Sequence, residues 1–113
     1  AAVSEAFMLA KKAGVDPALV FAAIKGGLAG STVMNAKAPM MLDGNYQPGF
    51  KIDLHIKDLN NALETGHNVG SPLPLTAAVM EMLYTTRTEG CGQEDHSAIS
   101  KYYEMITKTR IGG

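Results

Sequence analysis

Residues 52–63 read IDLHIKDLNNAL, and the spacing of their apolar residues decides the fold class. The large apolar side chains recur at intervals of four, three and four residues: Ile52, Ile56, Leu59 and Leu63. This spacing places them on one face of an α-helix, because a helix has about 3.6 residues per turn. We therefore expect a strong amphipathic helix from residue 52 to about residue 66.

The opposite face of this predicted helix is unusually polar. It carries a stripe at helical spacing: Lys57, Asn60, Asn61 and Glu64. His55 and Asp58 flank the stripe. Two adjacent asparagines are poor helix formers, so the stripe indicates a site that uses amides. A solvated face with paired charges is the alternative, and composition alone favours it.

Helical periodicity also dominates the rest of the chain. Apolar residues recur at helical spacing near the N-terminus up to Gly14, from Asp16 to Gly26, from Pro72 to Gly90, and from Asp95 onward. Ser31 caps a further short helix that we expect Pro39 to stop, and residues 39–51 read as turns. No segment shows sustained period-two alternation. The predicted class is all-α, a compact bundle of five main helices plus one or two short ones.

The amino-acid composition limits which binding partners and which cellular compartment are expected. The 113 residues suit one domain, with ten basic against eleven acidic residues and few aromatics. This balance argues against nucleic acid as a partner. Cys91 is the only cysteine, so no internal disulfide can form, and no apolar run approaches a membrane span. We expect a cytoplasmic protein without a membrane partner.

A glycine-rich run and three histidines could indicate ligand sites, but each has a simpler explanation. The glycine-rich run 26–31 resembles a phosphate loop, but no strand precedes it and its spacing matches neither nucleotide fingerprint. A helix-to-helix turn is favoured, although Ser31 remains able to present a small-anion pocket. The three histidines, His55, His67 and His96, fit no local pair of metal ligands. No metal site is predicted.

A longer stretch around the opening motif resembles a known family. Residues 49–63, GFKIDLHIKDLNNAL, are similar to the K-D-L-x-x-A-L region of the β-hydroxyacid dehydrogenases, the family of 3-hydroxyisobutyrate dehydrogenase. The similarity extends to residues 12–15 (KAGV), 26–32 (GGLAGST), 36–40 (AKAPM) and 95–98 (DHSA). It implies that residues 1–113 are the helical C-terminal domain of a two-domain enzyme like 6-phosphogluconate dehydrogenase. Its partners would be an N-terminal Rossmann domain that binds NAD or NADP, a small hydroxyacid substrate, and further copies of itself.

The resemblance also assigns residues. Lys57 corresponds to the lysine that reaches the bound cofactor, while Asp58 and Phe50 face the substrate. We add Ser31 to the substrate cleft because of its glycine-rich loop. The family's catalytic lysine belongs to a G-x-x-x-K-x-x-x-N pattern upstream of the region matched by residues 4–6, so no catalytic residue is expected in this chain.

The start of the chain gives a further expectation. No capping residue precedes Val3, which suggests a chain cut inside a longer helix, without the Rossmann domain and most of the interdomain helix. We then expect the face of Val3, Phe7 and Ala10 to lack part of its cover and to favour self-association. The isolated domain should be inactive and bind the cofactor poorly. The rival from another class is a non-catalytic helical interaction module.

Overall fold

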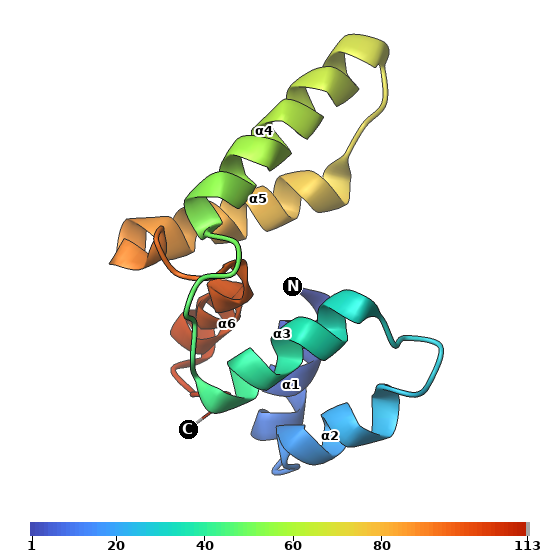
Figure 1. The fold of residues 1–113 in the computed structure, drawn as a ribbon, viewed down its shortest axis with the longest axis vertical. Coiled ribbons are helices and arrows are strands. Elements are labelled where there is room, and N and C mark those ends of the chain that lie inside the picture. Colours follow the sequence, from blue (N-terminus) through green and yellow to red (C-terminus); the bar gives the residue numbers. More distant parts are fainter. Residues whose placement is uncertain (113) are drawn as a thin grey trace.

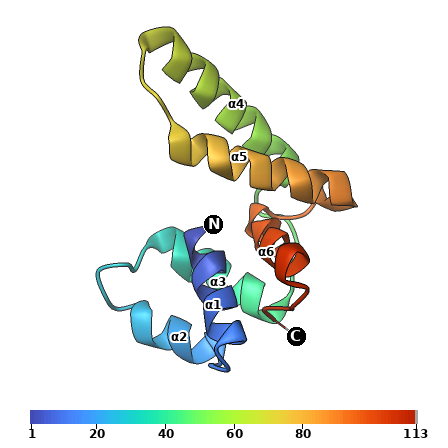
Figure 2. The same ribbon diagram turned by 180° about the vertical axis from the view of Figure 1, so that it is seen from behind.

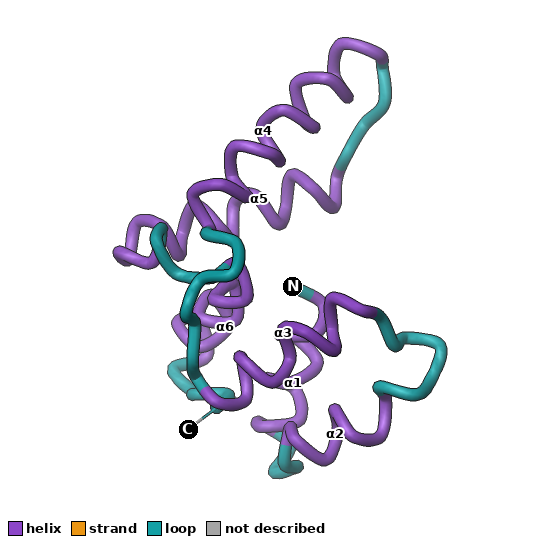
Figure 3. The backbone as a smooth tube through the Cα atoms, in the orientation of Figure 1, coloured by secondary structure: helices purple, strands orange, loops and turns teal. Residues whose placement is uncertain are grey.

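A computed structural model describes residues 1–112, and Gly113, the last residue of the predicted domain, lies outside the described residues. Six α-helices form within this range: α1 (Ala2–Lys12), α2 (Pro17–Ile24), α3 (Thr32–Asp43), α4 (Ile52–Val69), α5 (Pro74–Thr86) and α6 (Ser100–Thr107). Two short helical segments, η1 (Arg87–Cys91) and η2 (His96–Ile99), precede α6. Figure 3 shows helices joined by loops, without a strand in the described range. The all-α class is confirmed.

The helices form two groups that meet near the middle of the molecule. Helices α1, α2 and α3 pack together, while α4 and α5 form an antiparallel hairpin that projects away from them (Figures 1 and 2). Helix α6 and segment η2 lie between the two groups and contact both. Within residues 1–112, no helix is both long and apolar enough to cross a membrane.

The hydrophobic core lies where these elements meet. Phe7 of α1 is fully buried, and its ring packs edge-to-face on Phe21 of α2 at 6.4 Å between centroids. Ala10 is buried as well. The expectation that the face of Val3, Phe7 and Ala10 lacks part of its cover is therefore wrong for Phe7 and Ala10, because α2, α3 and α6 pack against α1, whereas Val3 is only half-buried. The apolar face of α4 is confirmed, with Ile52 at its buried base.

Helix α3 is longer than the sequence suggests. Ser31 caps it as expected, with Oγ accepting a hydrogen bond from the Met34 amide at 3.0 Å. The predicted stop at Pro39 is wrong, because the helix continues to Asp43 and ends at Gly44 in the left-handed conformation. Pro39 has no N–H to donate to the carbonyl four residues earlier, which weakens the helix locally. Burial of Met34, Ala38 and Met41 on one face offsets this cost.

Helix α4 also extends beyond its predicted end. It reaches Val69 and stops at Gly70, whose φ of 75° is the left-handed geometry that glycine adopts without strain. Gly66 is buried where the loop between α4 and α5 folds back, and its carbonyl accepts from the Ser71 amide at 2.7 Å. A Cβ at Gly66 would lie 2.8 Å from the Leu73 side chain, so only glycine fits this close approach.

The base of the α4–α5 hairpin is fastened to the segment before η2 by paired backbone hydrogen bonds. Amides of Ile52 and Asp53 donate to the carbonyls of Glu94 and Gly92, at 2.9 and 3.0 Å. In the other direction, the Asp95 amide donates to the Tyr46 carbonyl at 2.9 Å, and the His96 amide donates to the Phe50 carbonyl at 2.7 Å. We call this paired region, residues 46–53 with residues 92–96, the backbone clamp. It brings the loop before α4 against the start of η2.

Candidate functional site

The backbone clamp gathers three rings that lie far apart in sequence. Phe50 precedes α4, His55 lies in its first turn, and His96 begins η2. The Phe50 ring lies 5.7 Å from each histidine ring between centroids, and the two histidine rings are 5.1 Å apart. All three contacts are edge-to-face, and all three side chains are half-buried. We call this group the aromatic cluster.

Both histidines of the cluster have lowered pKa values. Burial lowers the pKa of His55, opposed by the nearby charge of Asp58. Burial likewise lowers the pKa of His96, opposed by Asp95. Because their ordinary value is about 6.5, both rings are neutral near pH 7. Each then offers one N–H donor and one acceptor nitrogen, a pattern suited to hydroxyl and carbonyl groups of a ligand.

A cavity of about 260 Å³ opens beside this cluster. Its polar lining comes from Lys37 of α3, from His55, and from His96 and Ser97 of η2. Val3 and Met34 are among the apolar side chains on its other walls. Pockets for drug-sized ligands span roughly 300–1,000 Å³, so this cavity suits a molecule of a few carbon atoms.

The structure brings together two of the predicted site residues. Phe50 belongs to the aromatic cluster itself. Asp58 lies three residues after His55 on α4, on the same side of the helix, and its side chain is exposed. The carboxylate is near enough to His55 to influence its pKa. Neither Phe50 nor Asp58 lines the cavity, and each is linked to it through His55.

Lys57 and Ser31 lie elsewhere. Lys57 is exposed, and it lies two positions after His55, which is a rotation of about 200° around the helix. The three ion pairs found within residues 1–112 use Lys37, Arg87 and Lys101 as cations. The Lys57 ammonium is thus on the other side of α4 from the cluster. Ser31 is occupied as the cap of α3 and does not line the cavity.

The polar stripe on α4 is partly explained by the neighbouring helix. Asn60 donates to the Tyr84 hydroxyl of α5 at 3.3 Å, while Asn61 and Glu64 are exposed. One amide of the predicted stripe is therefore used within the fold.

Sequence reasoning missed the residues that organise the cluster. It considered His55 and His96 only as metal ligands, and within the described residues no group of three or more His, Cys, Asp or Glu could hold a metal ion. The meeting of His55 with His96 depends on the backbone clamp, which local periodicity cannot reveal. The last helical pattern begins at Asp95, but local spacing gives no sign of its contacts with Lys37 and Phe50. The one available signal was the DHSA motif that carries His96.

Comparison with known proteins shows which family has this sequence and fold. Residues 1–103 match the family described as "NAD-binding of NADP-dependent 3-hydroxyisobutyrate dehydrogenase". The chain belongs to this family. The expected family resemblance is thereby confirmed, and with it membership of a group of nicotinamide-dependent oxidoreductases.

Individual members of the family show the extent of the likeness. The chain is 40% identical over 110 residues to 2-hydroxy-3-oxopropionate reductase of Escherichia coli K12, covering 97% of this chain and 38% of that protein. It is 36% identical over 106 residues to L-threonate dehydrogenase of Cupriavidus necator, covering 94% of this chain and 36% of that protein. The chain therefore spans little more than a third of the curated relatives it matches.

A solved structure agrees with the fold. The crystal structure of 3-hydroxyisobutyrate dehydrogenase from Salmonella typhimurium superimposes with a TM-score of 0.83 at 29% identity, covering 88% of this chain and 35% of that one. The helical arrangement of Figure 1 is thus a family arrangement.

Proposed function

We propose that this chain is the C-terminal helical domain of an NAD(P)-dependent enzyme that reduces 2-hydroxy-3-oxopropionate (tartronate semialdehyde) to D-glycerate. The 40% identity to a 2-hydroxy-3-oxopropionate reductase carries this proposal, and the small cavity beside the aromatic cluster agrees with a substrate of three carbons. Reaction on another small acid, as in 3-hydroxyisobutyrate dehydrogenase, is the second candidate, favoured by the fold comparison. Family membership argues against a purely non-catalytic interaction module.

The described residues contribute to the proposed binding of a nicotinamide cofactor through one charge, that of Lys57. Residues 1–112 contain no strand, so they hold no strand–turn–helix unit of the kind that binds the dinucleotide phosphates. The glycine-rich loop joins two helices, α2 and α3. The exposed Lys57 ammonium provides a point charge for the cofactor. We assign the phosphate and ribose sites, and hence the choice of NAD or NADP, to an N-terminal Rossmann domain.

In this arrangement the chain forms one wall of an interdomain cleft. The bound nicotinamide supplies the hydride-transfer chemistry. Phe50 contributes an apolar surface that excludes water, and the neutral His55 and His96 rings offer hydrogen bonds to the hydroxyl or carbonyl of the acid. No G-x-x-x-K-x-x-x-N pattern occurs in the sequence. We therefore propose that the proton-transferring lysine is supplied by the rest of the enzyme.

The proposal predicts that residues 1–113 alone do not turn over 2-hydroxy-3-oxopropionate with NADH or NADPH, because the dinucleotide and acid–base sites belong to the N-terminal domain. The loss of nicotinamide absorbance at 340 nm measures this. The full-length protein is the positive control and should consume the cofactor. Turnover by the 113 residues alone would contradict the assignment of the dinucleotide and acid–base sites to the N-terminal domain.

We also propose that the enzyme is cytoplasmic and assembles as a homo-oligomer. The single Cys91 is free and buried, which gives no sign of an oxidising compartment. At the tip of the α4–α5 hairpin, Val69 is 72% and Leu75 is 82% exposed. Leu75 is one of the apolar residues at helical spacing between Pro72 and Gly90, and the structure leaves it exposed. A groove of about 510 Å³, lined in part by Leu63 and Leu73, adjoins this tip and supports burial against a second copy.

Sedimentation velocity is expected to show a dimer or larger species that shifts toward monomer in Leu75→Asp. The substitution places a charge in the proposed interface, where its desolvation is unfavourable. Leu28→Asp is the matched control, because Leu28 is fully exposed in the loop between α2 and α3 and should leave the assembly unchanged. A wild-type chain that stays monomeric at high concentration argues against this interface.

A further inference from the structure

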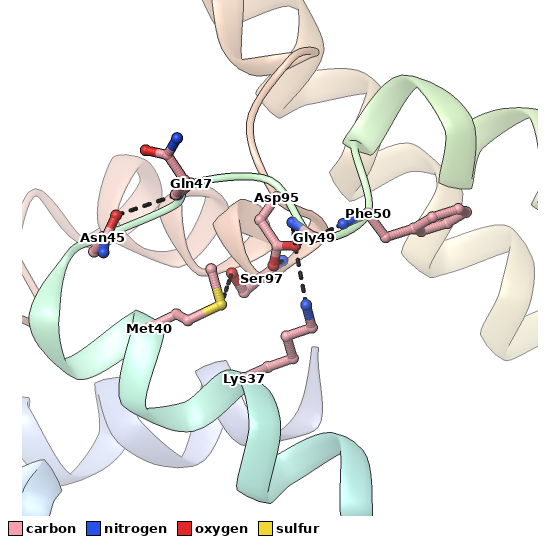
Figure 4. Close-up of polar contacts among 8 residues, drawn as sticks. All are labelled: Lys37, Met40, Asn45, Gln47, Gly49, Phe50, Asp95 and Ser97. Atoms are coloured by element: carbon pink, nitrogen blue, oxygen red, sulfur yellow. Dashed lines mark hydrogen bonds and ion pairs between the residues drawn. The ribbon is translucent and has the colours of Figure 1, made fainter.

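Asp95 is the only charged residue within residues 1–112 that is buried, and its side chain is fully enclosed. Its Oδ1 accepts three hydrogen bonds at 3.0 Å, from the amides of Gly49 and Phe50 and from the Lys37 ammonium. Its Oδ2 accepts a fourth from the Ser97 amide, also at 3.0 Å. Figure 4 shows these donors converging on one carboxylate from α3, from the loop before α4 and from η2.

These bonds compensate the cost of burial. Burial alone raises the pKa of Asp95, but hydrogen bonds from Ser97, the Phe50 amide and Lys37 outweigh it and hold the pKa well below its usual range. The carboxylate is therefore ionised at physiological pH. Its four hydrogen bonds join α3, the loop before α4 and η2 at one carboxylate, so Asp95 fixes how these three segments lie relative to one another.

The bonds fix the backbone of Phe50 from both sides. Its N–H donates to Asp95, and its carbonyl accepts from the His96 amide at 2.7 Å. Figure 4 shows the Phe50 ring directed away from the carboxylate. That ring meets the rings of His55 and His96. Movement of the Asp95 carboxylate would therefore displace the aromatic cluster.

We propose that Asp95 is a positioning residue for the substrate wall. It holds Phe50 and His96 in the geometry that receives the small acid, and Lys37 couples this geometry to α3. The proposal rests on the proposed function, since it assigns the aromatic cluster to substrate rather than to folding alone.

Asp53 provides a matched control on the same structural joint. It also ties the start of α4 to the segment before η2, through Gln93 at 2.9 Å and Arg87 at 3.4 Å. Its contacts involve none of the three rings. Asp53→Asn removes a less buried acid from the same joint without touching the backbone of Phe50.

The first test uses histidine NMR signals of the 113-residue chain in Asp95→Asn, Asp95→Ser and Asp53→Asn. Serine preserves a cap acceptor for the Ser97 amide, which protects the start of η2 if the asparagine variant fails to fold. The informative signal is that of His55, which has no hydrogen bond to Asp95 and meets it through the Phe50 ring. It should move in both Asp95 variants, whereas the His67 signal should not. The His96 signal follows the charge of its neighbour Asp95 in any case. In Asp53→Asn all three should keep their wild-type positions.

The second test uses the full-length enzyme. In Asp95→Ser, KM for the acid should rise about tenfold or more, with KM for the cofactor unchanged, because a displaced wall weakens binding of the acid. Asp53→Asn should stay within about twofold of wild type in both constants. Asp95 variants that lower thermal stability but leave the His55 signal and KM at wild-type values would reduce Asp95 to a structural residue. If the full-length protein has no dehydrogenase activity, the proposed function fails, while the NMR signals still decide whether Asp95 positions the cluster.

Discussion

In the full-length enzyme, Lys57→Ala is expected to lower kcat/KM by on the order of 10²-fold, a loss of about 2.7 kcal/mol of transition-state stabilisation. Lys57 is exposed on α4 and is absent from the three ion pairs of the described chain. Its removal should therefore change the free energy of unfolding by no more than about 0.5 kcal/mol. Steady-state kinetics together with urea denaturation separate these two effects.

A second exposed lysine serves as the control. Lys12 lies at the end of α1, in the other group of helices, and Lys12→Ala should leave both kinetics and stability unchanged. A folded and fully active Lys57→Ala enzyme would remove Lys57 from the cofactor site and leave family membership intact. The cleft would then lie entirely on the side of α4 that carries His55 and Asp58.

Phe7→Ala is expected to lower the free energy of unfolding by about 3–5 kcal/mol, because it removes a fully buried ring and leaves a cavity. The ring also loses its edge-to-face contact with Phe21. Domains of this size are stable by only about 5–15 kcal/mol, so this loss removes a large share of the total stability. Equilibrium urea denaturation followed by circular dichroism measures the loss.

Leu9→Ala isolates the contribution of burial. Leu9 is a large apolar residue on the same helix, but it is 72% exposed, so its substitution should cost no more than about 0.5 kcal/mol. Similar losses in the two variants would show that α1 does not pack as described.

Local sequence patterns predicted the helices whose boundaries and buried faces are set by neighbouring residues in the sequence. Asp16 accepts from the Ala18 amide at 2.9 Å and starts α2 where the sequence placed it. The apolar spacing of residues 52–63 likewise located α4. Pro39 misled the prediction because its local cost is overcome by burial on the other face of α3. That balance depends on neighbours that no local window contains.

The candidate site was harder to predict from the sequence, because it also depends on contacts between distant residues. Family resemblance supplied Phe50, Asp58 and Lys57, but not how they lie relative to one another. The contacts that organise the cluster join distant positions, with Lys37 and Phe50 lying 58 and 45 residues from Asp95. A hydrogen bond across such a separation leaves no periodic trace in the sequence.

The backbone clamp also holds together the two ends of the chain segment that forms the α4–α5 hairpin. The hydrogen bond from the Asp53 amide to the Gly92 carbonyl joins these two ends, so the hairpin connects to the rest of the domain at one place. The loop that joins α4 to α5 at the tip of the hairpin therefore lies at the end farthest from the backbone clamp (Figure 1). Mutations at the tip and at the base have separate structural consequences. Substitutions at the proposed assembly surface can thus accumulate without disturbing the proposed substrate wall.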